Sequence, residues 1–306
     1  MKRVSWGSSG QNVSAIAVGC MRINRVSLEQ AAKLVDTAME KGVNFFDHAD
    51  IYGGGECETI FARARELCGR KREDMFIQSK CGIVPGRMYD FSKKHILESV
   101  DGSLKRLKTD YLDALLLHRP DALCEPEEVA EAFDHLKQSG KVRYFGVSNH
   151  TPFQIELLKK WVNQPIMANQ MQFGPAHASM IRSGLEANMM SDGAVDRDGG
   201  VLDYCRLHDI TIQAWSPFQY GMFEGVFLNS EKYTALNETL RKLAKKYEVS
   251  DTVITVAWIL RHPANMQVLS GTMTLSRFED ICRASDIGLT REEWYEIYLA
   301  AGNILP

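Results

Sequence analysis

The segment SLEQAAKLVDTAMEKGVNFFD, residues Ser27–Asp47, contains one complete unit of a helix followed by a strand. Ser27 and Gln30 have the spacing of a capping box at a helix start, and Gly42 follows the apolar helical face and marks its end. The segment Asn44–Asp47, with the adjacent apolar residues Phe45 and Phe46, then predicts a short strand that is buried on both faces. The same alternation of helix and strand recurs along most of the chain.

Eight strands are predicted in this way, and several of them are nearly continuous apolar runs. They are Ser14–Gly19, Asn44–Asp47, Phe76–Lys80, Tyr111–His118, Tyr144–Ser148, Ala168–Gln172, Thr211–Trp215 and Gln267–Leu269. Further helix starts are predicted at Glu125 with Pro126, at Thr151 with Pro152 and Gln154, at Ser276 with Glu279, and at Thr290 with Glu293. Eight strand–helix units favour closure into a (β/α)₈ TIM barrel.

A doubly wound parallel sheet is the alternative fold. It is less favoured, because no GxGxxG motif follows the first strand and the glycines at 53–55 do not fit that spacing. Residues 1–12 are predicted to form a small hairpin that closes the bottom of the barrel. Residues 173–198 form a long connection after the sixth strand, in which 188–198 are predicted to be loop, and connections of this length are often functional. No linker divides the chain, so we expect a single domain over residues 1–306.

The composition is that of an ordinary globular protein, with 306 residues, 45% of them hydrophobic and 25% charged. A net charge of −3 gives no reason to expect nucleic acid or an anionic membrane as a partner. No apolar run reaches the roughly 18 residues that a membrane span needs. The seven cysteines are odd in number and form no CxxC pair, which favours a reducing, cytoplasmic setting.

Polar or aromatic residues stand at the ends of several predicted strands. Asp47 ends the second strand, with Tyr52 just beyond it, and Lys80 and His118 end the next two. The later strand ends carry Ser148, Asn149, Gln170 and Trp215. Since the carboxyl ends of barrel strands meet at one rim, we expect these side chains to form one site.

Tyrosine, lysine, aspartate and histidine together favour proton transfer to a carbonyl oxygen. A free tyrosine has a pKa of about 10, and a neighbouring lysine ammonium is expected to lower it by stabilising the phenolate. A carboxylate would hold the lysine in place, and a histidine would polarise the carbonyl by a hydrogen bond. None of these groups supplies a hydride, so the reaction requires a nicotinamide. No HxH or HExxH arrangement indicates a metal site.

Four stretches of the sequence resemble the aldo-keto reductases, in particular the bacterial branch with a short C-terminus. They are DHADIYG at 47–53 with Lys80 and His118, GVSN at 146–149, AWSPF at 214–218, and SGT at 270–272 with Arg277 and Asp280. The resemblance covers about residues 3 to 290. It implies an NADPH-dependent reductase of small-molecule aldehydes or ketones, with NADPH/NADP as the cofactor.

The resemblance also implies a role for each site residue. Tyr52 would be the general acid, tuned by Asp47 and Lys80, and His118 would orient the substrate carbonyl. Ser148, Asn149 and Gln170 would hold the nicotinamide carboxamide, Trp215 would stack on its ring, and Met21 would touch its side. The segment Ser216, Pro217 and Phe218 would lie along the pyrophosphate. Gly271, Thr272 and Arg277 would hold the adenosine 2′-phosphate, with Asp280 near the adenine.

The sequence departs from the family pattern at His48, where threonine or serine is frequent, and at Trp215, where tyrosine is common. His48 could alter the hydrogen bonding behind Asp47. Two other functions stay open: a cofactor-binding, redox-sensing regulatory subunit with little turnover, and a metal-dependent barrel hydrolase. The presence of all four residues of the catalytic tetrad, Asp47, Tyr52, Lys80 and His118, disfavours the first. The absence of convergent metal ligands at strand ends disfavours the second. The physiological substrate, the reaction direction and the oligomeric state do not follow from the sequence.

Overall fold

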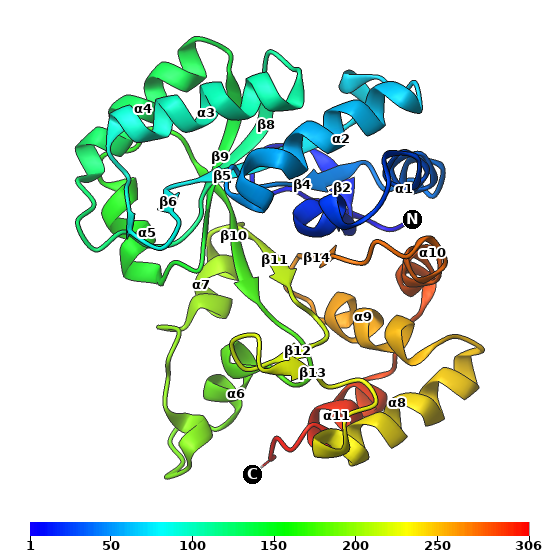
Figure 1. Ribbon diagram of the computed structural model, residues 1–306. Helices are drawn as coiled ribbons and strands as arrows, with labels where there is room; N and C mark the ends of the chain where they lie inside the picture. The colour runs from blue at the N-terminus through cyan, green and yellow to red at the C-terminus, as the bar shows by residue number, and fades with distance from the viewer. Residues whose placement is uncertain (306) are drawn as a thin grey trace.

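The computed structural model describes residues 1–305, and its centre is a closed barrel of eight parallel strands (Figure 1). In order around the barrel these are β3 (Ile16–Gly19), β4 (Phe45–Asp47), β5 (Phe76–Cys81), β8 (Leu112–Leu117), β9 (Val142–Ser148), β10 (Ile166–Gln172), β11 (Thr211–Trp215) and β14 (Met266–Ser270). Val268 of β14 pairs with Ile16 of β3, and this pairing closes the barrel. The predicted (β/α)₈ fold is therefore confirmed, with strand ends that differ from the predicted ones by up to two residues.

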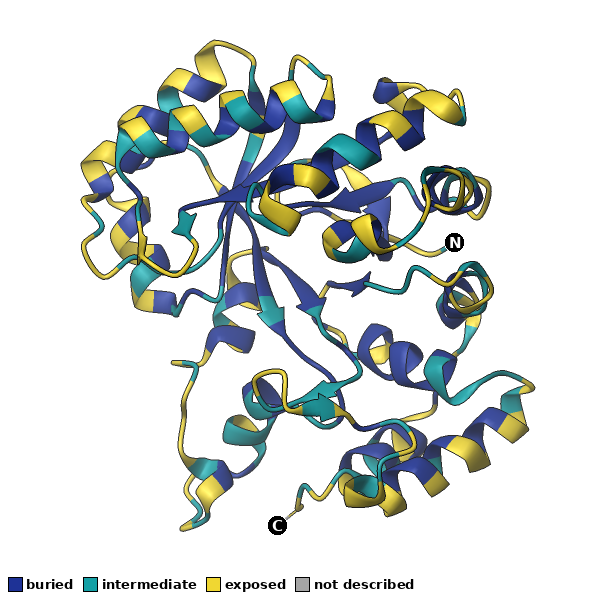
Figure 2. Ribbon diagram, viewed as in Figure 1, coloured by how far each residue is buried: buried dark blue, intermediate teal, exposed yellow. Residues whose placement is uncertain are grey.

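Helices pack around the outside of the barrel and leave the strands almost wholly buried (Figure 2). They are α1 (Leu28–Glu40), α2 (Glu56–Leu67), α3 (Lys93–Leu107), α4 (Pro126–Gln138), α5 (Pro152–Lys159), α6 (Ser179–Leu185), α7 (Val201–Leu207), α8 (Thr234–Tyr247), α9 (Asp251–Arg261), α10 (Leu275–Cys282) and α11 (Arg291–Ala300). Within residues 1–305, none of the helices has the length and apolar character needed to cross a membrane. The long connection at 173–198 is not wholly loop, because it contains α6 and a short 3₁₀ helix at Asp192–Ala194.

Most of the predicted helix starts are confirmed. Capping boxes begin α1 at Ser27, α5 at Thr151 and α11 at Thr290. The capping box predicted at Ser276 is wrong, because α10 begins at Leu275 with Thr274 as its N-cap. The Thr274 amide donates to the Thr272 hydroxyl at 3.2 Å, a turn that leads the chain into the helix before Ser276 is reached.

The N-terminal hairpin closes the bottom of the barrel, as predicted. Strand β1 (Arg3–Ser5) pairs antiparallel with β2 (Asn12–Ser14), and Trp6 in the turn is fully buried. The Trp6 ring lies 5.0 Å from the ring of Phe76 and 5.9 Å from that of Tyr144, measured between centroids. Trp6 thus fills the end of the barrel opposite the predicted site.

Trp6→Ala is expected to lower the free energy of unfolding by about 3–5 kcal/mol, since removal of a buried tryptophan leaves a cavity among aromatic rings. Urea denaturation followed by circular dichroism measures this. Trp161→Ala is the matched control, because Trp161 is 43% exposed and its removal should cost little. Equal losses for the two variants would contradict the assigned role of Trp6.

Candidate active site

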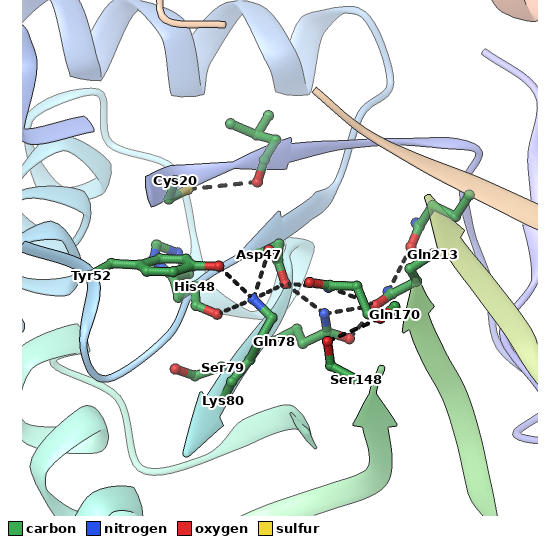
Figure 3. Close-up of polar contacts among 12 residues, drawn as sticks. Cys20, Asp47, His48, Tyr52, Gln78, Ser79, Lys80, Ser148, Gln170 and Gln213 are labelled. Carbon is green, nitrogen blue, oxygen red and sulfur yellow. Dashed lines mark hydrogen bonds and ion pairs between the residues drawn. The ribbon is translucent and has the colours of Figure 1, made fainter. Parts of the chain in front are cut away.

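The side chain of Lys80 is the centre of the site. Its ammonium lies at the end of β5, is fully buried, and donates to the Asp47 carboxylate at 2.8 Å, the His48 carbonyl oxygen at 2.7 Å and the Tyr52 hydroxyl at 3.1 Å (Figure 3). An ammonium has three N–H donors, so these acceptors satisfy all of them. The Tyr52 oxygen accepts from Lys80, which leaves the phenolic hydrogen available to another acceptor.

The position of Tyr52 depends on the three glycines that follow it. Gly53, Gly54 and Gly55 all have positive φ, at 59°, 64° and 92°, and turn the chain sharply from the loop into α2. A side chain would be strained at such angles. At Gly53 an added Cβ would also lie 2.8 Å from the Asn24 amide nitrogen. This turn lets the Tyr52 side chain reach back over the barrel end towards Lys80.

His118 is the first residue after β8, and its ring meets the Tyr52 ring edge-on with centroids 5.9 Å apart. Burial lowers the pKa of His118 well below its ordinary value, and the charges of Lys80 and Arg119 lower it further. The imidazole is therefore neutral at neutral pH and carries one N–H. Its buried Nδ1 has no hydrogen-bond partner among residues 1–305.

The pKa of Tyr52 differs from the prediction. Burial raises it by more than the Lys80 ammonium lowers it, so the net shift is upward. Burial lowers the pKa of Lys80, but the Asp47 carboxylate and the hydrogen bonds to Asp47 and Tyr52 together outweigh burial, so the net shift is upward. Tyr52 is thus a protonated phenol at neutral pH, and Lys80 is a fixed cation beside it.

A network of buried amides holds Asp47 from the other side. Gln78 Nε2 donates to Asp47 Oδ1 at 2.6 Å, and Gln170 Nε2 donates to the same oxygen at 3.1 Å. Both amides also donate to Gln213 Oε1, at 2.9 and 3.1 Å, and Gln213 in turn donates to Gln267. Of these four glutamines the sequence interpretation named only Gln170. The signal that could have revealed the others was a glutamine within each of four predicted strands, at Gln78, Gln170, Gln213 and Gln267.

The departure at position 48 leaves the bonding of Asp47 intact. The His48 side chain is fully buried, its ring lies edge-on to Phe61 at 4.5 Å, and both ring nitrogens lack hydrogen-bond partners among residues 1–305. Burial and the Lys80 charge lower the pKa of His48 to about 3, so the ring is neutral. Only the backbone carbonyl of His48 takes part in the site.

The predicted carboxamide-binding residues form a chain of hydrogen bonds at the ends of β9, β10 and β11. The Ser148 hydroxyl donates to the Gln170 carbonyl oxygen at 3.0 Å, and Asn149 Nδ2 donates to the Ser148 hydroxyl at 2.7 Å. The indole N–H of Trp215 donates to Asn149 Oδ1 at 3.2 Å. These residues are brought together, and their contacts fix the orientation of the half-buried Trp215 ring.

The segment Ser216, Pro217 and Phe218 leads directly from β11 into the hairpin of β12 (Gln219–Tyr220) and β13 (Gly225–Val226). Ser216 has a φ of +48°, and its carbonyl accepts from the amide of Gln219 at 3.0 Å. The Phe218 carbonyl accepts from the amide of Phe227 at 3.0 Å. The segment therefore runs as a braced turn at the rim next to Trp215.

The remaining predicted residues lie where β14 meets α10 and β3. Gly271 and Thr272 follow β14 on a partly exposed turn, and Arg277 is exposed in the first turn of α10. Met21, 42% exposed, follows β3, the neighbour of β14. Asp280 differs from the rest, because its carboxylate accepts from the Ser250 hydroxyl and lies 3.5 Å from Arg283.

Within residues 1–305, no group of three or more His, Cys, Asp or Glu side chains is placed to hold a metal ion. The site is instead one lysine, one phenol, one carboxylate and one imidazole, bordered by amides and an indole. Such a set can give and take protons and polarise an oxygen.

The family model described as the Aldo/keto reductase family matches residues 15–300. This chain belongs to that family. The aldo-keto reductase is thus an oxidoreductase that acts on carbonyl groups, and the resemblance stated from the sequence motifs is confirmed.

Two curated relatives and one solved structure are similar over nearly the whole length of this aldo-keto reductase. Oxidoreductase YdhF of Escherichia coli is 33% identical and covers 98% of both chains. A 6-dehydroglucose reductase of Novosphingobium aromaticivorans is 33% identical and covers 98% of this chain and 96% of its own. A thermostable aldo-keto reductase solved with the inhibitor epalrestat is 27% identical, with a TM-score of 0.80, and covers 98% of this chain and all of its own.

Proposed function

We propose that this aldo-keto reductase reduces aldehydes or ketones to alcohols with NADPH, using Tyr52 as the general acid. The observation that carries the proposal is the Tyr52 hydroxyl beside the Lys80 ammonium at 3.1 Å, with the other Lys80 donors taken by Asp47 and His48. The name of the Novosphingobium relative, a reductase of a carbonyl-bearing sugar, supports the same chemistry.

The residues present fit a nicotinamide cofactor. The Ser270 hydroxyl at the end of β14 is buried without a hydrogen-bond partner among residues 1–305, and an added Cβ on Gly271 would meet open space. Ser148, Asn149 and Gln170 would hold the carboxamide, Trp215 would stack on the ring and Met21 would touch its side. Ser216, Pro217 and Phe218 would follow the pyrophosphate. Gly271, Thr272 and Arg277 would hold the adenosine 2′-phosphate, with Asp280 near the adenine. When bound, the nicotinamide supplies a hydride to the carbonyl carbon.

The residues of the chain stabilise and neutralise the negative charge that then develops on the carbonyl oxygen. Tyr52 transfers its proton to that oxygen, and the N–H group of the neutral His118 ring donates a hydrogen bond to it. Lys80 stabilises the phenolate left on Tyr52. Asp47, held by Gln78 and Gln170, keeps Lys80 charged and in place. Burial excludes water, which strengthens each of these interactions.

The first experiment is a turnover assay with NADPH and a reactive test aldehyde. Consumption of NADPH with formation of the alcohol supports the reductase. The alternative, a cofactor-sensing regulatory subunit, requires tight NADPH binding with little turnover. The reductase is favoured because the tetrad is complete and the relatives described above are oxidoreductases or reductases. We further propose one domain over residues 1–306 acting in the cytoplasm, which the seven free thiols support.

Arg277→Ala is expected to weaken NADPH binding by about 10- to 100-fold and NADH binding far less. Charge-assisted hydrogen bonds from a guanidinium to a phosphate contribute roughly 1.5–3 kcal/mol, and the free N–H groups of the first turn of α10 add to the attraction. Titration of the intrinsic fluorescence with each dinucleotide gives the two affinities. Arg291→Ala is the matched control, since Arg291 is an exposed first-turn arginine of α11. If Arg277→Ala weakened the binding of NADPH and NADH equally, Arg277 would not bind the 2′-phosphate.

A further inference from the structure

Arg119, the residue after His118, is a half-buried cation without an acidic partner. Among residues 1–305 its guanidinium makes no ion pair or hydrogen bond, and the guanidinium carbon lies 5.8 Å from the centroid of the Trp215 ring. Burial lowers the pKa of Arg119, but an arginine remains protonated in a protein. A partly desolvated, unpaired guanidinium is unfavourable by itself and favours an anionic ligand.

Arg119 lies on a pocket of about 340 Å³ beside the candidate cofactor site. The pocket shares Asn149 and Trp215 with that site, and its apolar wall consists of Met171, Met180 and Met222. A cavity of this size and mixed character suits a small organic molecule.

The charge of the pocket lining is positive. Arg119 and Arg197 each contribute one positive charge, and the single carboxylate, Asp198, already accepts from the Ser179 hydroxyl at 2.8 Å. The two lining histidines, His150 and His177, have pKa values lowered by burial and are neutral at neutral pH. Two cations thus face one anion.

We propose that Arg119 makes the enzyme selective for aldehyde or ketone substrates that carry a carboxylate. The inference rests on the proposed reductase function and names its substrate class. A guanidinium binds a carboxylate through two parallel hydrogen bonds, and Met171, Met180 and Met222 contact the apolar body of the substrate. Arg119 follows His118 directly in the chain, and Asn149 and Trp215 line both this pocket and the candidate cofactor site, so the pocket adjoins the catalytic end of the barrel.

The test uses 4-carboxybenzaldehyde and its uncharged counterpart, methyl 4-formylbenzoate, which differ mainly in charge. The measured quantity is the ratio of kcat/KM for the acid to that for the ester. Arg119→Gln is expected to lower this ratio by about 10- to 100-fold, as expected for loss of a charge-assisted pair. Arg119→Lys keeps the positive charge but cannot make two parallel hydrogen bonds to a carboxylate, so it should lower the ratio less.

Arg87→Gln is the matched control, because Arg87 is an exposed arginine between β6 (Ile83–Val84) and β7 (Met88–Tyr89), in the loop after β5. It removes the same charge away from the pocket and should leave the ratio unchanged. If the acid-to-ester ratio fell equally in Arg119→Gln and Arg87→Gln, the effect would come from the net charge of the protein and not from a contact with Arg119. That result would overturn the inference. An unchanged ratio in Arg119→Gln would overturn the inference as well. This includes the case in which Arg119 contacts the cofactor, because kcat/KM would then fall equally for the acid and the ester.

Failure of the proposed function has a different signature. If the wild-type enzyme reduces neither aldehyde, the reductase proposal fails. Calorimetry with benzoate and benzamide then tests separately whether the pocket binds an anion. Benzoate binding that exceeds benzamide binding and is lost in Arg119→Gln supports the anion site. Equal binding of the two ligands, or no binding of either, overturns it.

Discussion

Tyr52→Phe is expected to lower turnover with a reactive aldehyde by at least about 100-fold, since general acid catalysis contributes roughly 10²–10⁴-fold. The substitution removes only the hydroxyl that lies 3.1 Å from Lys80 and leaves the ring against His118. NADPH affinity should therefore change little, as fluorescence titration would show. The loss should appear in kcat, because the missing proton transfer belongs to the chemical step.

Tyr89→Phe is the matched control for this change. Tyr89 lies on β7 and is 47% exposed, so its hydroxyl has no place in the buried site. Turnover of this variant should match that of the wild type. Comparable losses in both tyrosine variants would point to a general disturbance of the barrel rim rather than to a lost proton donor.

Lys80→Met should lower turnover by a similar factor, about 10²–10⁴-fold, by a different route. Burial already raises the pKa of Tyr52, and only the Lys80 charge opposes this effect strongly. Without it the phenolate formed on proton transfer has no cation beside it. The same change leaves the Asp47 carboxylate buried without its ion-pair partner, which typically costs about 3–5 kcal/mol of stability. Steady-state kinetics and urea denaturation measure the two effects separately.

The double variant Lys80→Met/Asp47→Asn separates catalysis from folding. Removal of both charges should restore much of the stability, because Gln78 and Gln170 can still hydrogen-bond the amide oxygen at position 47. Turnover should stay low, since Tyr52 still lacks its cation. Recovery of turnover together with stability would show that Lys80 acts only as a structural residue.

The barrel could be predicted because its strands are buried on both faces and are separated by helices with recognisable caps. Asn44–Asp47 contains Phe45 and Phe46, Phe76–Lys80 begins with Phe76 and Ile77, and each segment ends in a charged residue. In a parallel barrel such ends must share a rim. The meeting of Asp47, Tyr52 and Lys80 is therefore encoded by order and spacing alone.

Other features depend on three-dimensional surroundings and were not predictable. The net direction of the Tyr52 pKa shift is a balance between burial and the Lys80 charge, and burial has no local sequence signal. The start of α10 was misplaced, because the Thr272–Thr274 turn competes with the Ser276 capping pattern. The network of Asp47 and the four glutamines joins five strands, and its partners become evident only when the barrel closes.

The central claim, that Tyr52 donates the proton in an NADPH-dependent carbonyl reduction, is tested most directly by single-turnover kinetics. Wild-type enzyme and Tyr52→Phe are each saturated with NADPH and mixed with a reactive aldehyde, and loss of the reduced nicotinamide absorbance is followed by stopped flow. The predicted result is rapid oxidation in the wild type and oxidation slower by at least about 100-fold in the variant, at unchanged NADPH affinity. A variant that kept most of the wild-type rate would contradict the proton-donor assignment, and a wild type that bound NADPH without oxidising it would favour the sensing subunit.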